Sequence, residues 1–136
     1  MAETLELEIV TPDKKVVSDQ AEEVQIPGKK GYLGVLPGHA PLITELAVGE
    51  ISYRRDGTTV SLSVAWGFAE VLPHKVTILA ETAERAEEID VKRAEEQRQR
   101  AEQHLKSGDP NIDYERALNA LARAETRLAV AAKKHS

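Results

Sequence analysis

Apolar and polar residues alternate with a period of two through most of the first 80 residues of this 136-residue chain. This spacing is typical of β-strands that bury one face and expose the other. The apolar positions that carry the pattern are Leu5, Leu7 and Ile9; Val24 and Ile26; Leu42, Ile43 and Leu46; Ile51 and Tyr53; Val60, Leu62, Val64 and Trp66. We therefore expect short strands recurring about every 8 to 12 residues, as in β-sandwiches and barrels.

Two short segments are predicted to reverse the chain between neighbouring strands. Asp56-Gly57 is a two-residue hairpin signal, because both residue types tolerate positive φ angles. Pro73-His74 is expected to join a strand over Phe68 to Leu72 with one over Val76 to Ala80. Together with the alternating pattern, these turns predict an all-β domain that ends near Ala80.

Glycine and proline are concentrated between residues 27 and 42. Because glycine supplies positive φ angles and proline fixes φ and lacks a backbone donor, Pro27-Gly28 and Pro37-Gly38 are predicted to form tight turns. Between them, Leu33, Val35 and Leu36 form an apolar run that fits a short buried strand. From these residue types alone, the segment is equally well explained as an ordinary corner of a β-sandwich.

Beyond Thr82 the composition changes to Ala, Glu, Arg and Gln, which favour helix. Asp90 is a suitable N-cap for a helix reaching about Lys106, and the sequence Ser-Gly-Asp-Pro at 107–110 ends it. Asp113 is placed to cap a second helix, whose apolar stripe consists of Ala117, Leu121, Ala124, Leu128 and Ala131. We predict a β-sandwich over residues 1–83 and an antiparallel helical hairpin over residues 84–136.

The predicted contact between the two helices is made mainly of small side chains. The first helix contributes Ala94, Ala101 and Leu105, and the second contributes alanines with a few leucines. At about 25 cal/mol per Å² of buried apolar area, this contact is weak beside a leucine-rich core. Two interpretations remain open: a hairpin that opens about Gly108, and a permanently packed helical pair.

Charge is distributed unevenly along the chain. Residues 1–82 carry 7 basic and 12 acidic side chains, whereas residues 83–136 carry 11 of each, which together give the net charge of −5. From Arg116 onward there are five basic residues and one acid, a local charge of +4. This end favours either an acidic partner or a solvated face whose cations lie toward a helix C-terminus.

Composition argues against several other classes of protein. There is no cysteine, which removes disulfides and thiolate chemistry, and no apolar run of about 18 residues that would span a membrane. The acidic N-terminal residues do not resemble a secretory or transit signal. The acidic balance and the 4% aromatic content argue against nucleic-acid binding.

Motifs for catalysis are missing from the sequence. The four histidines, His39, His74, His104 and His135, have no metal-ligand spacing, and neither a GxSxG elbow nor a phosphate-transfer loop of the Walker type is present. The helical carboxylates alternate with arginines, as solvated ion pairs do. His39 is interpreted either as a hydrogen-bonded structural residue or as part of a contact surface.

One constellation in the helical half points to a ligand. Asp90, Arg93 and Arg100 lie near one face of the first predicted helix, while Arg123 and Arg127 are one turn apart on the second. Guanidinium groups bind phosphate through forked hydrogen bonds, and a carboxylate accepts from an exocyclic amine such as that of adenine. If the hairpin folds, these groups converge into a site for a phosphorylated ligand.

Three motifs of the chain resemble those of the ATP synthase epsilon subunit family. They are Gly31-Tyr32-Leu33-Gly34-Val35-Leu36-Pro37-Gly38-His39-Ala40-Pro41-Leu42, Gly67-Phe68-Ala69-Glu70-Val71 and Ile89-Asp90-Val91-Lys92-Arg93-Ala94. They are spread over residues 31–94, from the expected sandwich into the first expected helix. The resemblance implies a non-catalytic subunit of the central stalk of a proton-translocating F-type ATP synthase, peripheral to the cytoplasmic face of a bacterial plasma membrane and attached to it only through the complex.

The resemblance also implies partners and a regulatory role. The sandwich would touch the gamma subunit and the c-ring, with Tyr32 and His39 at the c-ring, although many relatives carry an acidic residue where Tyr32 stands. The extended hairpin would inhibit ATP hydrolysis by meeting an acidic segment of a β subunit in the catalytic head. The basic residues expected there are Arg116, Arg123, Arg127, Lys133 and Lys134.

No cofactor is implied beyond a regulatory ATP held in the folded hairpin. The positions that match the family's nucleotide contacts are Glu84, Ile89, Asp90, Arg93, Ala94, Arg100, Arg123 and Arg127. Two other classes of function stay open on the residues. One is a generic adaptor whose sandwich and hairpin bind different proteins, and the other is a small hydrolase that uses His39 or His74.

Overall fold

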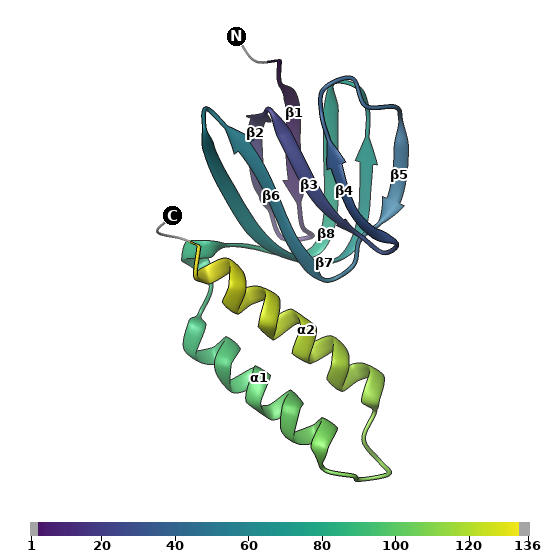
Figure 1. The fold of residues 1–136 in the computed structure, drawn as a ribbon, viewed down its shortest axis with the longest axis vertical. Coiled ribbons are helices and arrows are strands. Elements are labelled where there is room, and N and C mark those ends of the chain that lie inside the picture. The colour runs from purple at the N-terminus through teal and green to yellow at the C-terminus, as the bar shows by residue number, and fades with distance from the viewer. Residues whose placement is uncertain (1–2, 134–136) are drawn as a thin grey trace.

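The strands of this protein form two packed layers, with a pair of helices beneath one end of them (Figure 1). The computed structural model describes residues 3–133. The strands are β1 (Leu5–Val10), β2 (Lys15–Ala21), β3 (Glu23–Gly28), β4 (Gly31–Val35), β5 (Leu42–Glu45), β6 (Gly49–Arg55), β7 (Thr58–Val71) and β8 (Lys75–Arg85). A 3₁₀ turn, η1 (Ala86–Glu88), leads to α1 (Val91–Lys106) and α2 (Tyr114–Ala131). The predicted fold class, a β-sandwich followed by a two-helix hairpin, is confirmed.

The long strand β7 connects the two layers. The order of hydrogen-bonded strands is β2-β1-β8-β7-β6-β3-β4, and β5 also pairs with β7. The first half of β7 pairs with β6 and its second half with β5, both antiparallel, while β8 follows it along nearly its whole length. β1 pairs with β8 in parallel, and β2 closes that side of the order. A bend in β7 is therefore needed to pass from one layer to the other.

The bend lies at Trp66-Gly67. Trp66 has φ 58° and Gly67 has φ 119°, both on the positive side that most side chains avoid. The backbone of β8 approaches so closely that a Cβ on Gly67 would lie 1.9 Å from the carbonyl oxygen of Leu79. The sequence pattern predicted two strands here, ending at Trp66 and starting at Phe68. The structure has one continuous strand, because Gly67 allows the kink without breaking the ladder with β8.

The alternating apolar positions fill the space between the layers. Leu5, Leu7 and Ile9 of β1 are at most 1% exposed, as are Val24 and Ile26 of β3. Three apolar positions near the Gly/Pro block do not enter this core. Leu36, predicted to lie in a buried strand, follows the end of β4 and is 56% exposed, while Leu42 and Ile43 of β5 are 37% and 70% exposed.

Three of the four predicted turns are confirmed. Asp56-Gly57 joins β6 to β7 with φ values of 49° and 79°, Pro37-Gly38 lies in a turn, and Pro73-His74 joins β7 to β8. The prediction for Pro27-Gly28 is wrong, because both residues belong to β3 and the turn is at Lys29-Lys30. Proline is tolerated there because β6 pairs only with Glu23 to Gln25, so no partner on that side requires its missing N–H.

A polar contact joins β2 to β6, which are not adjacent in the strand order. The hydroxyl of Tyr53 donates to Asp19 Oδ2 at 3.1 Å, and Arg55 forms an ion pair with the same carboxylate at 3.0 Å. Burial raises the pKa of the Tyr53 hydroxyl, and the neighbouring Asp19 charge raises it further. The sequence pattern does not single out β2, whose place depends on this contact and on its pairing with β1.

Both helices begin where their N-caps predict. Asp90 Oδ1 accepts from the backbone N–H of Arg93 at 3.0 Å, and Asp113 Oδ1 accepts from that of Arg116 at 3.1 Å. Gly108, with φ 69°, lies between the helices. The side chains buried at the seam are alanines: Ala94, Ala101, Ala117 and Ala124. No helix within residues 3–133 is both long and apolar enough to cross a lipid bilayer.

Helix α2 is the one that rests on the sandwich. It lies nearer the strands than α1 in Figure 1 and contacts β6, β7 and η1. At its C-terminal end Val130 and Ala131 pack with Ala86 and Ile89 into a small buried cluster, separate from the sandwich core. The helical hairpin is therefore docked against the sandwich mainly through α2.

We predict that Gly67→Ala severely destabilises the sandwich. The new methyl group would overlap the Leu79 carbonyl, and alanine at φ 119° is strained, so we expect the free energy of unfolding to fall by about 3 kcal/mol or more. Gly57→Ala is the control: its φ is also positive, but no atom lies within 4 Å of the new Cβ, and we expect a loss of about 1–2 kcal/mol. Urea unfolding followed by circular dichroism measures both, and equal losses would contradict the close approach.

Candidate functional site

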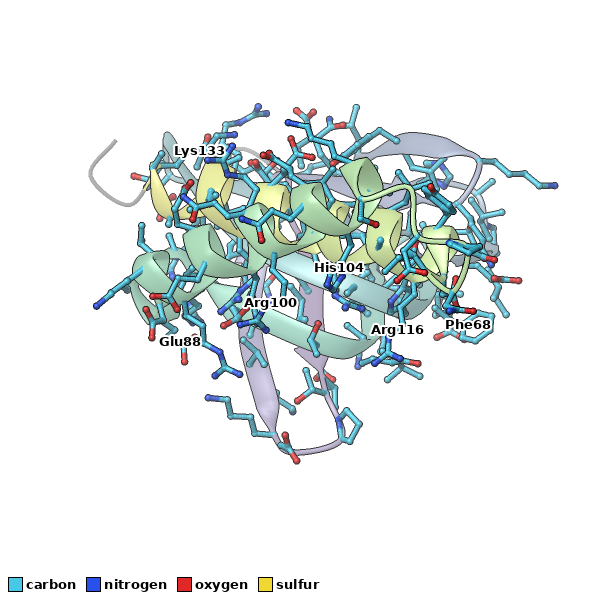
Figure 2. All side chains as sticks on the ribbon, turned by 90° about the horizontal axis from the view of Figure 1, so that it is seen from below. Phe68, Glu88, Arg100, His104, Arg116 and Lys133 are labelled. Carbon is cyan, nitrogen blue, oxygen red and sulfur yellow. The ribbon has the colours of Figure 1, made fainter. Side chains whose placement is uncertain are left out.

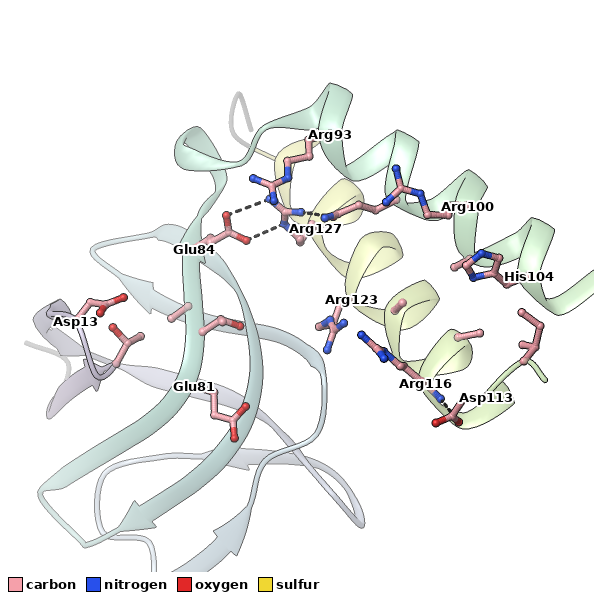
Figure 3. A pocket seen from close by; sticks show the side chains of 18 of the residues that line it. Asp13, Glu81, Glu84, Arg93, Arg100, His104, Asp113, Arg116, Arg123 and Arg127 are labelled. Atoms are coloured by element: carbon pink, nitrogen blue, oxygen red, sulfur yellow. Dashed lines mark hydrogen bonds and ion pairs between the residues drawn. The ribbon is translucent and has the colours of Figure 1, made fainter.

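A cleft of about 940 Å³ separates the helical hairpin from β8 and the turn between β1 and β2 (Figure 3). One wall consists of the inner faces of α1 and α2. The opposite wall includes Asp13, Lys14 and the segment from Glu81 to Glu84. The cleft forms because α2 packs on the sandwich whereas α1 makes few contacts with it, which leaves a space between α1 and β8.

Two matching stripes of side chains line the helical wall. On α1 they are Arg93, Gln97, Arg100 and His104, and on α2 they are Arg116, Ala120, Arg123 and Arg127. Each set follows the spacing i, i+4, i+7, i+11, which keeps side chains on one face of an α-helix. At 1.5 Å per residue, each stripe is about 16 Å long. Five guanidinium groups therefore face one elongated cleft.

Arg127 is held by partners from β8 and α1. Its Nε donates to Glu84 Oε1 at 2.7 Å, one terminal nitrogen donates to Glu84 Oε2 at 3.2 Å, and the other donates to Gln97 Oε1 at 2.8 Å. The Arg127 side chain is only 16% exposed. This clasp joins β8 to both helices and neutralises the deepest guanidinium of the cleft with a carboxylate of the protein itself.

The other four guanidinium groups of the cleft have no such partner. Arg93, Arg100, Arg116 and Arg123 make no side-chain hydrogen bond or ion pair with any of residues 3–133 and are exposed. Figure 3 shows Arg93 beside Arg127, with Arg123 and Arg116 farther along α2. Closely spaced like charges disfavour one another, and forked hydrogen bonds to phosphate oxygens would relieve that cost. The cleft is thus suited to an elongated polyanion.

The cleft brings together five of the eight residues predicted to contact a nucleotide: Glu84, Arg93, Arg100, Arg123 and Arg127. The other three lie elsewhere. Asp90 uses Oδ1 to cap α1 and does not line the cleft, and Ile89 is 7% exposed within the small cluster at the end of α2. Ala94 is fully buried between the helices, where only a small side chain fits the seam.

Gln97 is a residue of the cleft that the sequence did not single out. It orients Arg127, and it occupies the position between Arg93 and Arg100 on the same helical face. The shared i, i+4, i+7, i+11 spacing on both helices is the signal that identifies it, together with His104 and Arg116. His104 lies in the cleft wall and belongs to no group of possible metal ligands among residues 3–133.

The residues predicted to contact partner proteins are distributed over three regions. Tyr32 in β4 is 62% exposed, and His39 donates through Nδ1 to the Ala40 carbonyl at 2.7 Å. Of the predicted inhibitory residues, Arg116 and Arg123 face the cleft, Arg127 is clasped, and Lys133 lies at the far end of the helical pair from Arg116 (Figure 2). Lys134 lies outside the described residues.

Comparisons with known families cover almost all of the chain. Residues 4–86 match the family described as "ATP synthase, Delta/Epsilon chain, beta-sandwich domain", and residues 87–132 match "ATP synthase, Delta/Epsilon chain, long alpha-helix domain". The ATP synthase epsilon chain of Koribacter versatilis is 70% identical over 110 residues, 81% of this chain and 78% of that one. The epsilon chain of Nitratidesulfovibrio vulgaris (strain DP4) is 49% identical over 96% of this chain and 97% of its own length.

Solved structures agree on the fold. A chain of the Euglena gracilis mitochondrial ATP synthase (OSCP/F1/c-ring) superimposes with a TM-score of 0.80 at 24% identity, covering 93% of this chain and 80% of that one. A chain of the Tetrahymena thermophila mitochondrial ATP synthase (central stalk/c-ring) gives 0.57 at 13% identity, covering 98% of each. With the sequence relatives, this defines the class of protein as a rotary-motor subunit with a sandwich and a helical pair. The chain belongs to the ATP synthase delta/epsilon family, as a bacterial-type epsilon subunit of an F-type ATP synthase.

We predict that Glu84 and Arg127 stabilise the docked hairpin as a pair. Glu84→Gln and Arg127→Gln should each lower the free energy of unfolding by about 1–3 kcal/mol, because each leaves a partly buried charge without its partner. The double variant should lose less than the sum, with a coupling of about 1–2 kcal/mol. Arg98→Gln is the control, since Arg98 pairs with Glu95 and Glu102 on the outer surface of α1. Additive losses in a double-mutant cycle would show that the clasp does not act as a pair.

Proposed function

We propose that this chain is a non-catalytic subunit of the central stalk, with its sandwich seated between the gamma subunit and the c-ring. The match of both halves to the delta/epsilon family, in one chain, is the observation that carries this proposal. The solved complexes named above, which contain a c-ring, support the placement by analogy of fold. In this role the sandwich transmits force by packing and carries no chemistry of its own. Tyr32 and His39 are the residues proposed to meet the c-ring.

The location follows from the proposed assembly. The chain is peripheral, bound to the cytoplasmic face of a bacterial plasma membrane through a complex that translocates protons. A generic adaptor is the alternative, in which the sandwich and the hairpin bind unrelated proteins. The adaptor would not be expected to carry family likeness through both halves, so the stalk is preferred.

The helical hairpin is proposed to be the regulatory element. In its extended form, the basic residues of α2 would approach an acidic segment of a β subunit in the catalytic head and oppose ATP hydrolysis. The docked form keeps Arg116 and Arg123 on the cleft and Arg127 in the clasp with Glu84. Arg127 is then occupied by Glu84, and Arg116 and Arg123 face the sandwich across the cleft, so the docked form is a poorer match than the extended form for an acidic segment.

ATP is proposed to favour the docked form by binding in the cleft. The four unpaired guanidinium groups match the charge of a triphosphate, and both helices contribute to them, so the ligand would hold the helices together. A ligand that binds only the docked form stabilises it by about 2.7 kcal/mol at 100 times its dissociation constant. Low ATP would therefore release the hairpin. The chain requires no other cofactor in this proposal.

The stalk and regulatory roles are tested together in the assembled enzyme. We expect complexes that carry residues 1–86 alone to assemble and to hydrolyse ATP faster than complexes with the full chain, because the inhibitory element is absent. The rates are measured on purified complexes at low ATP. Failure of the full chain to purify with a rotary complex would contradict the stalk role. Equal hydrolysis rates in the two complexes would contradict the regulatory role.

Nucleotide binding is tested on the isolated full chain. Adding ATP should shift the amide signals of Arg93, Arg100 and Arg123, and Arg123→Gln should weaken binding about tenfold or more through loss of a charged hydrogen bond. Arg98→Gln, whose side chain is outside the cleft, should leave the affinity unchanged. Spectra that do not change at millimolar ATP would remove the sensor and leave the stalk role intact.

A further inference from the structure

A second ion pair fixes the C-terminal end of α2 to the sandwich. Lys133, just beyond the helix, places Nζ 2.8 Å from both carboxylate oxygens of Glu50. The Glu50 side chain is 20% exposed and that of Lys133 is 51% exposed. This contact is separate from the Glu84–Arg127 clasp, and the proposed nucleotide cleft uses neither of its residues.

Glu50 is tied on its backbone side to another part of the sandwich. It is the second residue of β6, and its N–H donates to the hydroxyl of Tyr32 at 3.1 Å. Tyr32 is the second residue of β4, directly after the Lys29-Lys30 turn, and is 62% exposed. A single residue thus contacts the end of α2 with its side chain and the β3–β4 hairpin with its backbone.

The backbone next to Glu50 is in close contact with Tyr32, so it cannot accept a movement of the Tyr32 ring toward it without shifting. A Cβ on Gly49 would lie 2.6 Å from Pro27 Cβ and 2.9 Å from the Tyr32 hydroxyl. Such distances mean that Pro27 and Tyr32 pack directly on the main chain of residue 49. Displacement of the Tyr32 ring therefore moves the start of β6, and the Glu50 carboxylate with it.

We propose that Glu50 couples the exposed face of Tyr32 to the docking of α2, so that a protein pressing on Tyr32 alters how firmly the hairpin is held. The coupling runs from Tyr32 through the Glu50 amide and carboxylate to Lys133. This proposal depends on the proposed function in one respect, namely that a partner protein binds at Tyr32. The regulation it adds is mechanical: occupancy at the β3–β4 hairpin is transmitted to the helices without any ligand in the cleft.

The expected change in the docking equilibrium is small, so the coupling adjusts how firmly the helices are held and does not switch them between two states. Ion pairs with a half-exposed member change an equilibrium by about twofold to fivefold. Loss of the Tyr32 hydroxyl removes one neutral hydrogen bond and leaves the ion pair misplaced, so its effect should be smaller. The two effects are not independent, because both act through Glu50.

The coupling is tested by amide spectra of the isolated full chain. Tyr32→Phe removes one oxygen and should shift the amides of Ala131, Ala132 and Lys133, which Tyr32 does not itself contact. Lys133→Gln should in turn shift the Glu50 amide and the Tyr32 ring signals. Unchanged α2 signals in Tyr32→Phe would overturn the proposal, since all the intervening contacts are short.

Amide exchange gives the corresponding fold-change. We expect Lys133→Gln to speed exchange at Ala132 twofold to fivefold. Tyr32→Phe should speed exchange at Ala132 by less than twofold in the wild-type chain. The same substitution should leave the exchange rate unchanged when Lys133→Gln is already present. Equal factors in both backgrounds would overturn the coupling.

Lys29→Gln is the matched control. Lys29 lies in the turn between β3 and β4 and forms an ion pair with Glu45 at 2.9 Å, so its side chain pairs with β5 and not with the helices. It should shift turn amides and leave the end of α2 unchanged, and a shift at α2 as large as that of Tyr32→Phe would overturn the route through Glu50. These experiments use the isolated chain, without a partner. A negative result would therefore overturn the coupling and leave the stalk role unaffected. Evidence against the stalk role would not change their interpretation.

Discussion

The contact between α2 and the sandwich is small, and the behaviour of the whole chain depends on it. Its buried apolar part is a four-residue cluster, Ala86, Ile89, Val130 and Ala131, and its polar part is the Glu84–Arg127 clasp and the Glu50–Lys133 pair. Apolar burial contributes about 25 cal/mol per Å², so alanines contribute little. The more exposed Glu50–Lys133 pair contributes about 0–1 kcal/mol, and the partly buried clasp about 1–2 kcal/mol. The sandwich core is built instead of fully buried leucine, isoleucine and valine. The sandwich can therefore stay folded while the helices change position.

The charges of the hairpin make its two positions chemically different. When it is docked, Glu84 neutralises Arg127, and the guanidinium groups of four further arginines line the cleft without pairing with its other carboxylates, Asp13, Glu81 and Asp113. An anion in the cleft would offset the repulsion among these arginines, and in the proposed extended form the separation of α1 from α2 would relieve it. The same side chains then form a basic surface available to an acidic protein. The Glu50–Lys133 pair adds a separate restraint just beyond the C-terminal end of α2, about two turns from the clasp.

Much of the fold was predictable because local chemistry determines it. Asp90, Asp113 and Asp56-Gly57 each act within a few residues, and alternation identified the core strands. What the sequence did not reveal depends on residues far apart in the chain. Glycine is required at residue 67 because the Leu79 carbonyl on β8 comes so close, and Pro27-Gly28 stays in β3 because of its pairing with β4. The arginine positions were predictable from helical spacing, but the clasp was not, since Glu84 and Arg127 are 43 residues apart.

The hairpin is proposed to exchange between a docked and an undocked position, and ATP is proposed to favour the docked one. The chain has no cysteine, so spin labels can be placed on cysteines introduced at Thr58, in the sandwich, and at Gln103, on α1; both positions are exposed. Pulsed dipolar spectroscopy then measures the distance between the labels. We predict two distance populations without ligand and a single short one at millimolar ATP. One unchanging distance under both conditions would contradict the account.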